Sequence, residues 1–409
     1  MFLSKKFRIT PFFVIFNVII IYLLALFIKL GISFFFFLFK FLIILEVVDF
    51  NLWLIEILES RKIKIRRNVK EKAIEGEKLS VNITLNNKSS FLFINLCIRE
   101  NIEKSASNIE HSEIIHIFHR GLFKISYILD CDKRGKYKLG PVILDIRDTL
   151  GFFSFSRIYN IFSVVYVYPE IFDIDSFPPL MRSNLPWWGI ETRRVSGDED
   201  EFFGVREYKQ GDPIRRIHWL STARKNKLIV KEFERFSFYK VSIMFVLNKD
   251  ENIGVGKKST GEFIIKIAAS LSKYFIERNV STEVIAHTGR FFHFPPNKGF
   301  YHLEGLMKFY ASTGIESRIK IGEFWDAASS LITSNTNLFI LTTEENISEL
   351  KKIFSFSKYN ISFIFIILLS STFLSPPQPS KVGDLKISLK AKYFFISSND
   401  NLHNLFSKI

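Results

Sequence analysis

The side chains whose types and spacing suit partner binding or chemistry are concentrated between residues 204 and 234 of this 409-residue chain. The stretch combines arginines and carboxylates with aromatic residues and one histidine, which are the residue types of ion-pair networks, docking anchors and acid–base sites. Asp212 stands between Gly211 and Pro213 in a turn signal and is able to cap the segment that follows. The candidate residues are Arg206, Glu207, Tyr208, Gly211, Asp212, Arg215, Arg216, Trp219, Ala223, Arg224, Lys231, Glu232 and Glu234.

Two interpretations of this charged stretch stay open. In the first, its cations and carboxylates pair in a network that locks the stretch against the neighbouring domains. In the second, arginines and Trp219 form a docking surface for a partner, with Tyr208 as a further amphipathic anchor. The cations are Arg206, Arg215, Arg216, Arg224 and Lys231, and the carboxylates are Glu207, Asp212, Glu232 and Glu234.

Catalysis has weaker support in the sequence. No Gly-x-Ser-x-Gly, His-Glu-x-x-His or Gly-x-x-x-x-Gly-Lys-Ser/Thr pattern is present. His218 has no nucleophile pattern near it, so a structural role is the simpler interpretation. We therefore predict a protein that is not an enzyme and needs no cofactor. The alternative is a membrane-associated enzyme that uses Asp212, His218 and the neighbouring arginines.

Charge and cysteine content narrow the class further. The formal net charge of +15 is partly carried by residues that flank apolar segments, so we predict no nucleic-acid partner. Nucleic-acid binding would need an exposed basic stripe with stacking aromatic residues. Cys97 and Cys131 have no metal-ligand spacing, which predicts two reduced thiols and no zinc site.

Two apolar runs near the N-terminus predict a transmembrane hairpin in contact with membrane lipid. Residues 12–28 and 31–48 each approach the ~20 residues that a helix needs to cross the hydrocarbon core. Lys40 and Glu46 lie inside the second run. A cleaved signal peptide is the rival interpretation of the first run, but no small-residue cleavage site follows it and a second apolar run begins at once.

The basic residues that flank the apolar runs predict the orientation. They lie before the first run and after the second, while the tip of the hairpin carries only Lys29. The positive-inside rule then predicts a multi-pass protein of the cell (inner) membrane whose termini and soluble domains are cytoplasmic. The flanking residues are Lys5, Lys6, Arg8, Arg61, Lys62, Lys64, Arg66, Arg67, Lys70 and Lys72.

Beyond the hairpin, the periodicity of apolar residues changes along the chain. Short alternating runs punctuated by glycines, such as 79–85 and 122–129, predict a β-sandwich-like domain. Residues 171–238 read as extended, loop-rich chain that leads into a strand near residues 228–234. Apolar runs alternating with helical patterns then predict a doubly wound α/β domain. The predicted segments are 1–60 (hairpin and flanks), 61–170 (β-sandwich-like), 171–238 (signature linker) and 239–409 (α/β).

The stretch from Gly204 to Glu234 closely resembles the signature of the domain-of-unknown-function 58 family. The matching elements are Arg-Glu-Tyr at 206–208, Gly-Asp at 211–212, Arg-x-Ile-x-Trp at 215–219, Ala-Arg at 223–224 and Lys-Glu-x-Glu at 231–234. The segments 132–137 and 148–153 resemble two further motifs of that family, although Thr149 and Leu150 depart from the second.

The resemblance implies a particular architecture and partner. Family members carry a transmembrane pair, a β domain, the signature and a von Willebrand factor A-like α/β domain. They are associated with MoxR-type AAA+ ATPases and other A-domain proteins in the maturation of protein complexes. The resemblance therefore implies a membrane-anchored, non-catalytic interaction or assembly factor.

The resemblance also implies where a metal would bind. A domains often hold a divalent ion through Asp-x-Ser-x-Ser after the first strand and an Asp after a later strand. Here the first position reads Asn248-Lys249-Asp250-Glu251-Asn252, and the later one carries Thr342 and Thr343. We therefore predict no metal site, with Asp250 as the alternative of a shifted ligand.

Overall fold

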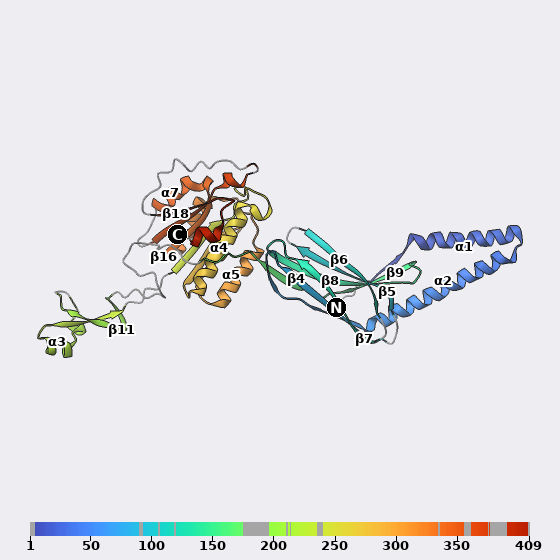
Figure 1. The fold of residues 1–409 in the computed structure, drawn as a ribbon, viewed down its shortest axis with the longest axis horizontal. Helices are drawn as coiled ribbons and strands as arrows, with labels where there is room; N and C mark the ends of the chain where they lie inside the picture. Colours follow the sequence, from blue (N-terminus) through green and yellow to red (C-terminus); the bar gives the residue numbers. More distant parts are fainter. Residues whose placement is uncertain are drawn as a thin grey trace. The chain divides into compact units, whose positions relative to one another are not determined.

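The computed structural model describes residues 5–89, 93–104, 107–117, 120–174, 196–209, 212, 214–234, 240–333, 336–355, 361–374, 376 and 391–407. They belong to two compact units, Met1–Glu170 and Ile171–Ile409 (Figure 1).

The first unit begins with a short strand and a helical hairpin. Strand β1 (Lys5–Ile9) leads into helix α1 (Pro11–Leu30), which is followed by α2 (Ser33–Glu59) and the 3-10 turn η1 (Ser60–Lys62). Gly31 ends α1 with a left-handed φ of 65° and donates its N–H to the Phe27 carbonyl at 2.8 Å. Because glycine adopts this conformation at no steric cost, the chain turns back directly into α2.

Helix α1 supports the first predicted membrane span. Its mean hydropathy is 2.7, and only 6% of its most apolar window is buried. Among the residues that the structure describes, α1 is the one helix long and apolar enough to cross a membrane. Lys40, Glu46 and Asp49 interrupt the apolar surface of α2, so the second predicted span stays a prediction.

The chain on both sides of the hairpin joins one β domain. Strand β1 pairs antiparallel with β9 (Phe153–Tyr159), from Lys5 opposite Arg157 to Ile9 opposite Phe153. The segment before α1 and the segment after α2 therefore lie at the same sheet.

Two sheets with a shared apolar core form this β domain, in line with the β-rich pattern of residues 61–170. Leu85 of one sheet and Leu144 of the other are both fully buried in that core. The smaller sheet has the order β2 (Ile63–Asn68), β4 (Lys78–Asn87), β7 (Gly121–Asp130). The larger sheet joins β1, β9, β8 (Gly135–Arg147), β10 (Ser163–Tyr168) and β3 (Lys72–Ile74), with β5 (Phe93–Lys104) on β8 and β6 (Ser107–Ile117) on β5.

A buried ion pair connects the two sheets. Arg67 of β2 and Glu100 of β5 form the pair, and both side chains are 0% exposed. Tyr127 of β7 donates its hydroxyl to Glu100 Oε2 at 2.6 Å, and Arg67 Nη1 donates to the Leu139 carbonyl at 3.2 Å. Burial and the bond to Glu100 raise the pKa of Tyr127, so the phenol keeps the proton that it donates.

The second unit contains a six-stranded mixed sheet with the order β15-β14-β13-β16-β17-β18. All pairs are parallel except β14 with β15, the antiparallel strand at one edge, which carries Pro295 and Pro296. The strands are β13 (Lys240–Val246), β14 (Ser281–His287), β15 (Phe291–Asn297), β16 (Thr336–Thr343), β17 (Ile361–Leu368) and β18 (Lys392–Ile396).

Helices cover both faces of this sheet. On one face, Phe275 of α4 contacts Phe339, and Tyr310 of α5 contacts Phe245. On the other face, Trp325 of α6 shares an apolar core with Phe363. The helices are α4 (Thr260–Glu277), α5 (Phe300–Ser312), α6 (Ile321–Ala328), α7 (Ile347–Ser355) and α8 (Leu402–Ser407), with 3-10 turns η3 (Gly256–Lys258), η4 (Ser329–Leu331), η5 (Glu344–Asn346) and η6 (Ser370–Phe373).

The sequence predictions for this unit hold for most elements and fail in two places. The alternation of strands and helices predicted for residues 239–409 is found in the structure. Strand β15 was not predicted. The prediction of loop-rich chain for residues 171–238 is wrong where the structure has β11 (Ser196–Glu207) and α3 (Trp219–Lys225). For β11, pairing with β12 (Ile229–Glu234) overrides the low strand propensity of an acidic, glycine-containing segment.

The buried ion pair gives a stability prediction. Glu100→Ala should lower the free energy of unfolding of the first unit by ~3–5 kcal/mol, because it leaves the Arg67 charge buried without its partner. Urea unfolding of the full chain in detergent, followed by circular dichroism, measures the change.

Glu103→Ala is the matched control on the same strand. Its pair with Lys138 is about half exposed, so its loss should cost at most ~1 kcal/mol. Equal effects of the two substitutions would show that the Arg67–Glu100 pair does not hold the sheets together.

Candidate functional site

The signature stretch folds around an antiparallel pair of strands, β11 and β12. The register runs from Ser196 opposite Glu234 to Glu207 opposite Ile229, with irregularities on either side of Phe202. The chain that connects the two strands forms the 3-10 turn η2 (Ile214–Arg216) and helix α3, which is labelled in Figure 1.

Asp212 is held by a two-pronged ion pair. Arg206 Nη1 and Nη2 each donate to one carboxylate oxygen of Asp212 at 2.7 Å, and the Lys209 N–H donates to Oδ2 at 2.8 Å. These bonds, the one from Arg206 first, lower the pKa of Asp212 to about 2. The carboxylate therefore stays ionised at neutral pH and serves as a fixed acceptor rather than as an acid or base.

His218 has a structural role as the residue that caps α3. Its Nδ1 accepts the Ser221 N–H at 3.3 Å and lies 2.7 Å from Ser221 Oγ. Its own backbone N–H donates to the Ile229 carbonyl at 2.8 Å, and Thr222 Oγ1 accepts the Ile229 N–H at 3.0 Å. The start of α3 is thereby fixed to strand β12.

Three large apolar side chains project from this framework into solvent. Ile214, Trp219 and Leu220 are 71%, 65% and 63% exposed, whereas Ile217 and Val230 are buried beneath them. The basic residues Arg224 and Lys225 in the last turn of α3 are also exposed. We refer to Ile214, Trp219, Leu220, Arg224 and Lys225 as the signature surface.

The structure separates the predicted candidates into several groups. Glu207 pairs with Lys227, a partner that was not predicted, at 3.1 Å with both side chains exposed. Tyr208 is partly buried, and its N–H donates to the Leu228 carbonyl at 2.9 Å. Ala223 and Arg224 are exposed; Arg216 and Lys231 are partly buried. Gly211 and the side chains of Arg215, Glu232 and Glu234 lie outside the described residues.

Sequence reasoning missed Ile214 and Leu220 as members of this surface. Both stand inside the signature, but apolar residues next to a strand are usually core residues. The available signal was their position beside Trp219 in a strongly charged stretch, where solvent exposure is expected for neighbouring side chains.

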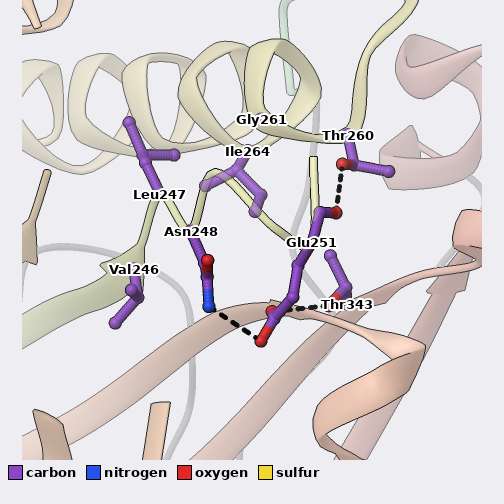
Figure 2. Close-up of a pocket in the computed structure, with 8 residues that line it drawn as sticks. All are labelled: Val246, Leu247, Asn248, Glu251, Thr260, Gly261, Ile264 and Thr343. Carbon is purple, nitrogen blue, oxygen red and sulfur yellow. Dashed lines mark hydrogen bonds between the residues drawn. The ribbon is translucent and has the colours of Figure 1, made fainter. Parts of the chain in front are cut away.

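A second cluster lies at the carboxyl ends of β13 and β16, where the A-domain resemblance implies a metal site. Figure 2 shows Glu251 pointing toward Asn248 and Thr343 in a shallow pocket. Glu251 Oε1 accepts from Asn248 Nδ2 at 3.1 Å, and Oε2 accepts from Thr343 Oγ1 at 3.1 Å and from Asn346 Nδ2 at 2.5 Å. Burial raises the pKa of Glu251, while the bonds from Asn346 and Thr343 act against that rise.

This donor set fits a metal ion poorly. Amide and hydroxyl hydrogens occupy the carboxylate oxygens that a hard cation would need. Asp250, the predicted alternative ligand, is exposed, and its N–H donates to Asn248 Oδ1 at 2.9 Å. Within the described ranges, no group of three or more His, Cys, Asp or Glu side chains is placed to hold a metal.

One family model matches the signature region. Residues 204–322 match the family described as "Protein of unknown function DUF58". The uncharacterized protein YeaD of Bacillus subtilis (strain 168) is 24% identical over 164 residues, which are 39% of this chain and 41% of that relative. The match thus spans about two fifths of the relative's length.

Solved structures give only distant likenesses. A CARDB domain from Pyrococcus furiosus resembles 26% of this chain at 8% identity, with 94% of that domain covered and a TM-score of 0.21. The C-terminal domain of wzt resembles 27% of this chain at 11% identity, with 75% of that domain covered and a TM-score of 0.23. Scores this low do not indicate a shared fold.

The ion pair at Asp212 predicts a titration. The pKa of this carboxyl is depressed from 3.8 to about 2, so the stabilising pair is fully present above about pH 4 and is lost as the pH falls through about 2. Carboxyl carbon chemical shifts measured by NMR should report this midpoint and show it rising toward the ordinary value in Arg206→Ala, with the Lys209 N–H bond still lowering it in part. Lys227→Ala is the control and should leave the midpoint unchanged; an unchanged midpoint in Arg206→Ala would contradict the assignment.

The Glu251 cluster predicts a loss of stability. Glu251→Ala removes the acceptor of the buried Thr343 hydroxyl, which should cost ~1–3 kcal/mol. The amides of Asn248 and Asn346 keep other acceptors, the Ile319 carbonyl and Thr342 Oγ1, and should add little to this loss. Urea unfolding monitored by tryptophan fluorescence measures it, because Trp325 lies in the core of this sheet. Asp250→Ala, one position away and exposed, should change stability by less than ~0.5 kcal/mol. If both variants are as stable as the parent protein, the cluster does not support this edge of the sheet.

Proposed function

Because the chain belongs to the DUF58 family through residues 204–322, we propose that it is a membrane-anchored, non-catalytic interaction or assembly factor. The observation that carries the proposal is the signature surface. It presents Ile214, Trp219 and Leu220 to solvent on a framework fixed by the Arg206–Asp212 pair and the His218 cap.

The composition of the signature surface is that of a protein-binding hot spot. Tryptophan and arginine are the residue types most enriched among interface anchors, and a preorganised framework lowers the ordering cost of binding. The exposed Arg224 and Lys225 beside the apolar residues favour a partner whose apolar pocket has an acidic rim.

A MoxR-type AAA+ ATPase is the proposed partner, together with other A-domain proteins, and maturation of protein complexes is the proposed process. This follows from the signature resemblance in residues 204–234. We also propose that residues 239–409 are a metal-free von Willebrand factor A-like domain. Its largely parallel sheet with helices on both faces and its Glu251 cluster support that proposal.

The membrane topology that we propose is a hairpin with two crossings. Strand β1 and the strands after α2 belong to the same β domain. A chain that crosses the membrane in α1 must therefore cross back before it reaches β2. Across the hairpin, Asn17 Nδ2 donates to Glu46 Oε1 at 3.3 Å, which provides a partner for a charged residue of the returning helix.

We propose a cytoplasmic location for the β domain, and its basic residues support that proposal. Lys5, Lys6 and Arg8 lie in β1, and Arg61, Lys62 and Lys64 follow α2 directly. These are the positions that the positive-inside rule retains in the cytoplasm.

The enzyme alternative has no comparable support in the described residues. It would use Asp212, His218 and neighbouring arginines, but Asp212 is held ionised by Arg206 and His218 caps a helix. Both groups have structural partners instead of a free acid–base function.

Co-purification tests the proposal. The tagged full-length protein is extracted from its native membranes in mild detergent, with and without ATP, and the associated proteins are identified by mass spectrometry. The parent protein should retain an AAA+ ATPase, and the double variant Trp219→Ala/Leu220→Ala should lose it. With the purified ATPase, loss of a hot spot worth ~2 kcal/mol or more raises the Kd at least ~30-fold.

Tyr301→Ala is the control, because Tyr301 is 89% exposed on a different element, α5. It should leave the Kd unchanged. Circular dichroism verifies that all variants are folded. Retention of the ATPase by the folded double variant, or its absence from the parent protein in every nucleotide condition, would contradict the proposal.

A further inference from the structure

The helical hairpin meets the β domain through an aromatic cluster that surrounds two buried carboxyl groups. Phe152 contacts Phe13 and Phe16 of α1, with ring centroids 5.9 and 4.7 Å apart. Phe153 stacks on Trp53 of α2 at 5.3 Å. Phe152 ends the β8–β9 turn and Phe153 begins β9, in the segment 148–153 that resembles a family motif.

The two carboxyl groups are Asp49 of α2 and Asp148 of that turn. They are 5% and 2% exposed and lie in hydrogen-bond contact with each other. Asp148 Oδ2 and Oδ1 accept the N–H groups of Phe152 and Phe153, both at 2.8 Å. Asp49 Oδ1 accepts the Thr149 N–H at 3.2 Å.

The fourth oxygen, Asp49 Oδ2, is buried without a hydrogen-bond donor from the described residues. Two ionised carboxylates only accept hydrogen bonds, so their contact requires a proton between them. Both oxygens of Asp148 already accept backbone N–H bonds that favour its ionised form. With one shared proton, the pair avoids placing two charges in contact in this buried position.

We propose that Asp49 and Asp148 share a single proton, and that this proton holds the helical hairpin against the β domain. The joint is then a pH-sensitive device. While the proton is present, the pair forms a buried hydrogen bond between α2 and the β8–β9 turn. When it leaves, two like charges are left in contact in an apolar environment, and the attachment of α2 weakens.

Three other ionisable groups near this junction interact with residues other than Asp49 and Asp148. On α2, Glu46 accepts from Asn17 at 3.3 Å. On β9, Arg157 Nη2 donates to the Ile57 carbonyl at 3.0 Å. On β8, Asp145 pairs with Arg99. The remaining ones are Arg8 of β1, Glu56 of α2 and Arg147 of β8, while α1 presents Phe13 and Phe16.

The direction of the pH effect follows from the titration of the pair. Burial is the main cause that raises the pKa of Asp148 from 3.8 to about 6, and the hydrogen bond with Asp49 is the next. The Phe153 and Phe152 N–H groups lower this pKa in part. Because the folded pair holds its proton more tightly than an unfolded one, its stabilising contribution is complete below about pH 4. It declines as the pH rises and is lost above about 6.

Infrared spectroscopy of the full-length protein in detergent micelles tests the shared proton. The carbonyl stretch of protonated carboxyl groups should contain a component that is present at about pH 5 and is lost with a midpoint near 6. The difference spectrum between the parent protein and Asp49→Asn should isolate this component, because the amide of the variant donates to Asp148 at every pH. Glu46→Gln, one helical turn earlier, should keep it.

Thermal unfolding provides the second readout. The Tm of the parent protein should fall by roughly 5 °C between about pH 5 and pH 7.5 relative to that of Asp49→Asn, whose amide cannot ionise. The proposal is overturned if the parent protein shows no carboxyl component with a midpoint near 6, a measurement that needs no variant, or if a folded Asp49→Asn protein keeps that component in full.

Discussion

The pairing of β1 with β9 is the constraint on which the arrangement of the first unit depends. Five residues before the hairpin are held in the same sheet as the strands that follow it. The two helices are thereby tied to the β domain at both ends. Their bases meet Phe152, Phe153 and the two buried aspartates, so the hairpin is attached by backbone pairing, aromatic packing and one polar contact.

The signature uses its polar residues in a related way. Arginine, aspartate and histidine side chains in a dense charged stretch suggest chemistry, but the geometry assigns Asp212 and His218 to holding backbone N–H groups. Their effect is to fix η2 and α3 so that apolar side chains remain exposed. Charged residues thus stabilise the framework of this segment, and apolar residues provide its exposed surface, which reverses the usual distribution.

Much of the fold could be predicted from the sequence, because the strands of the second unit are continuous apolar runs of strand length and α1 is a long apolar segment. The errors have physical causes. Strand β11 contains Asp198 to Glu201 and two glycines, so its pairing with β12 depends on tertiary contacts. The contact between Asp49 and Asp148 joins residues far apart in the chain, and no local pattern reports it. The sequence predicted the pairing of Arg206 with Asp212 as one of several possible ion pairs. It did not predict the exposure of Ile214 and Leu220, because apolar residues next to a strand are usually core residues.

The two prolines in the edge strand β15 affect how copies of a membrane-tethered protein can pair with one another. Tethering raises the local concentration of neighbouring copies, and an open sheet edge is then a template for lateral aggregation. Pro295 and Pro296 lie in β15, at the edge of the described sheet, beside the register shift opposite β14. Proline has no N–H to offer an incoming strand. This edge is therefore protected against the continuous edge-to-edge pairing that crowding would otherwise favour.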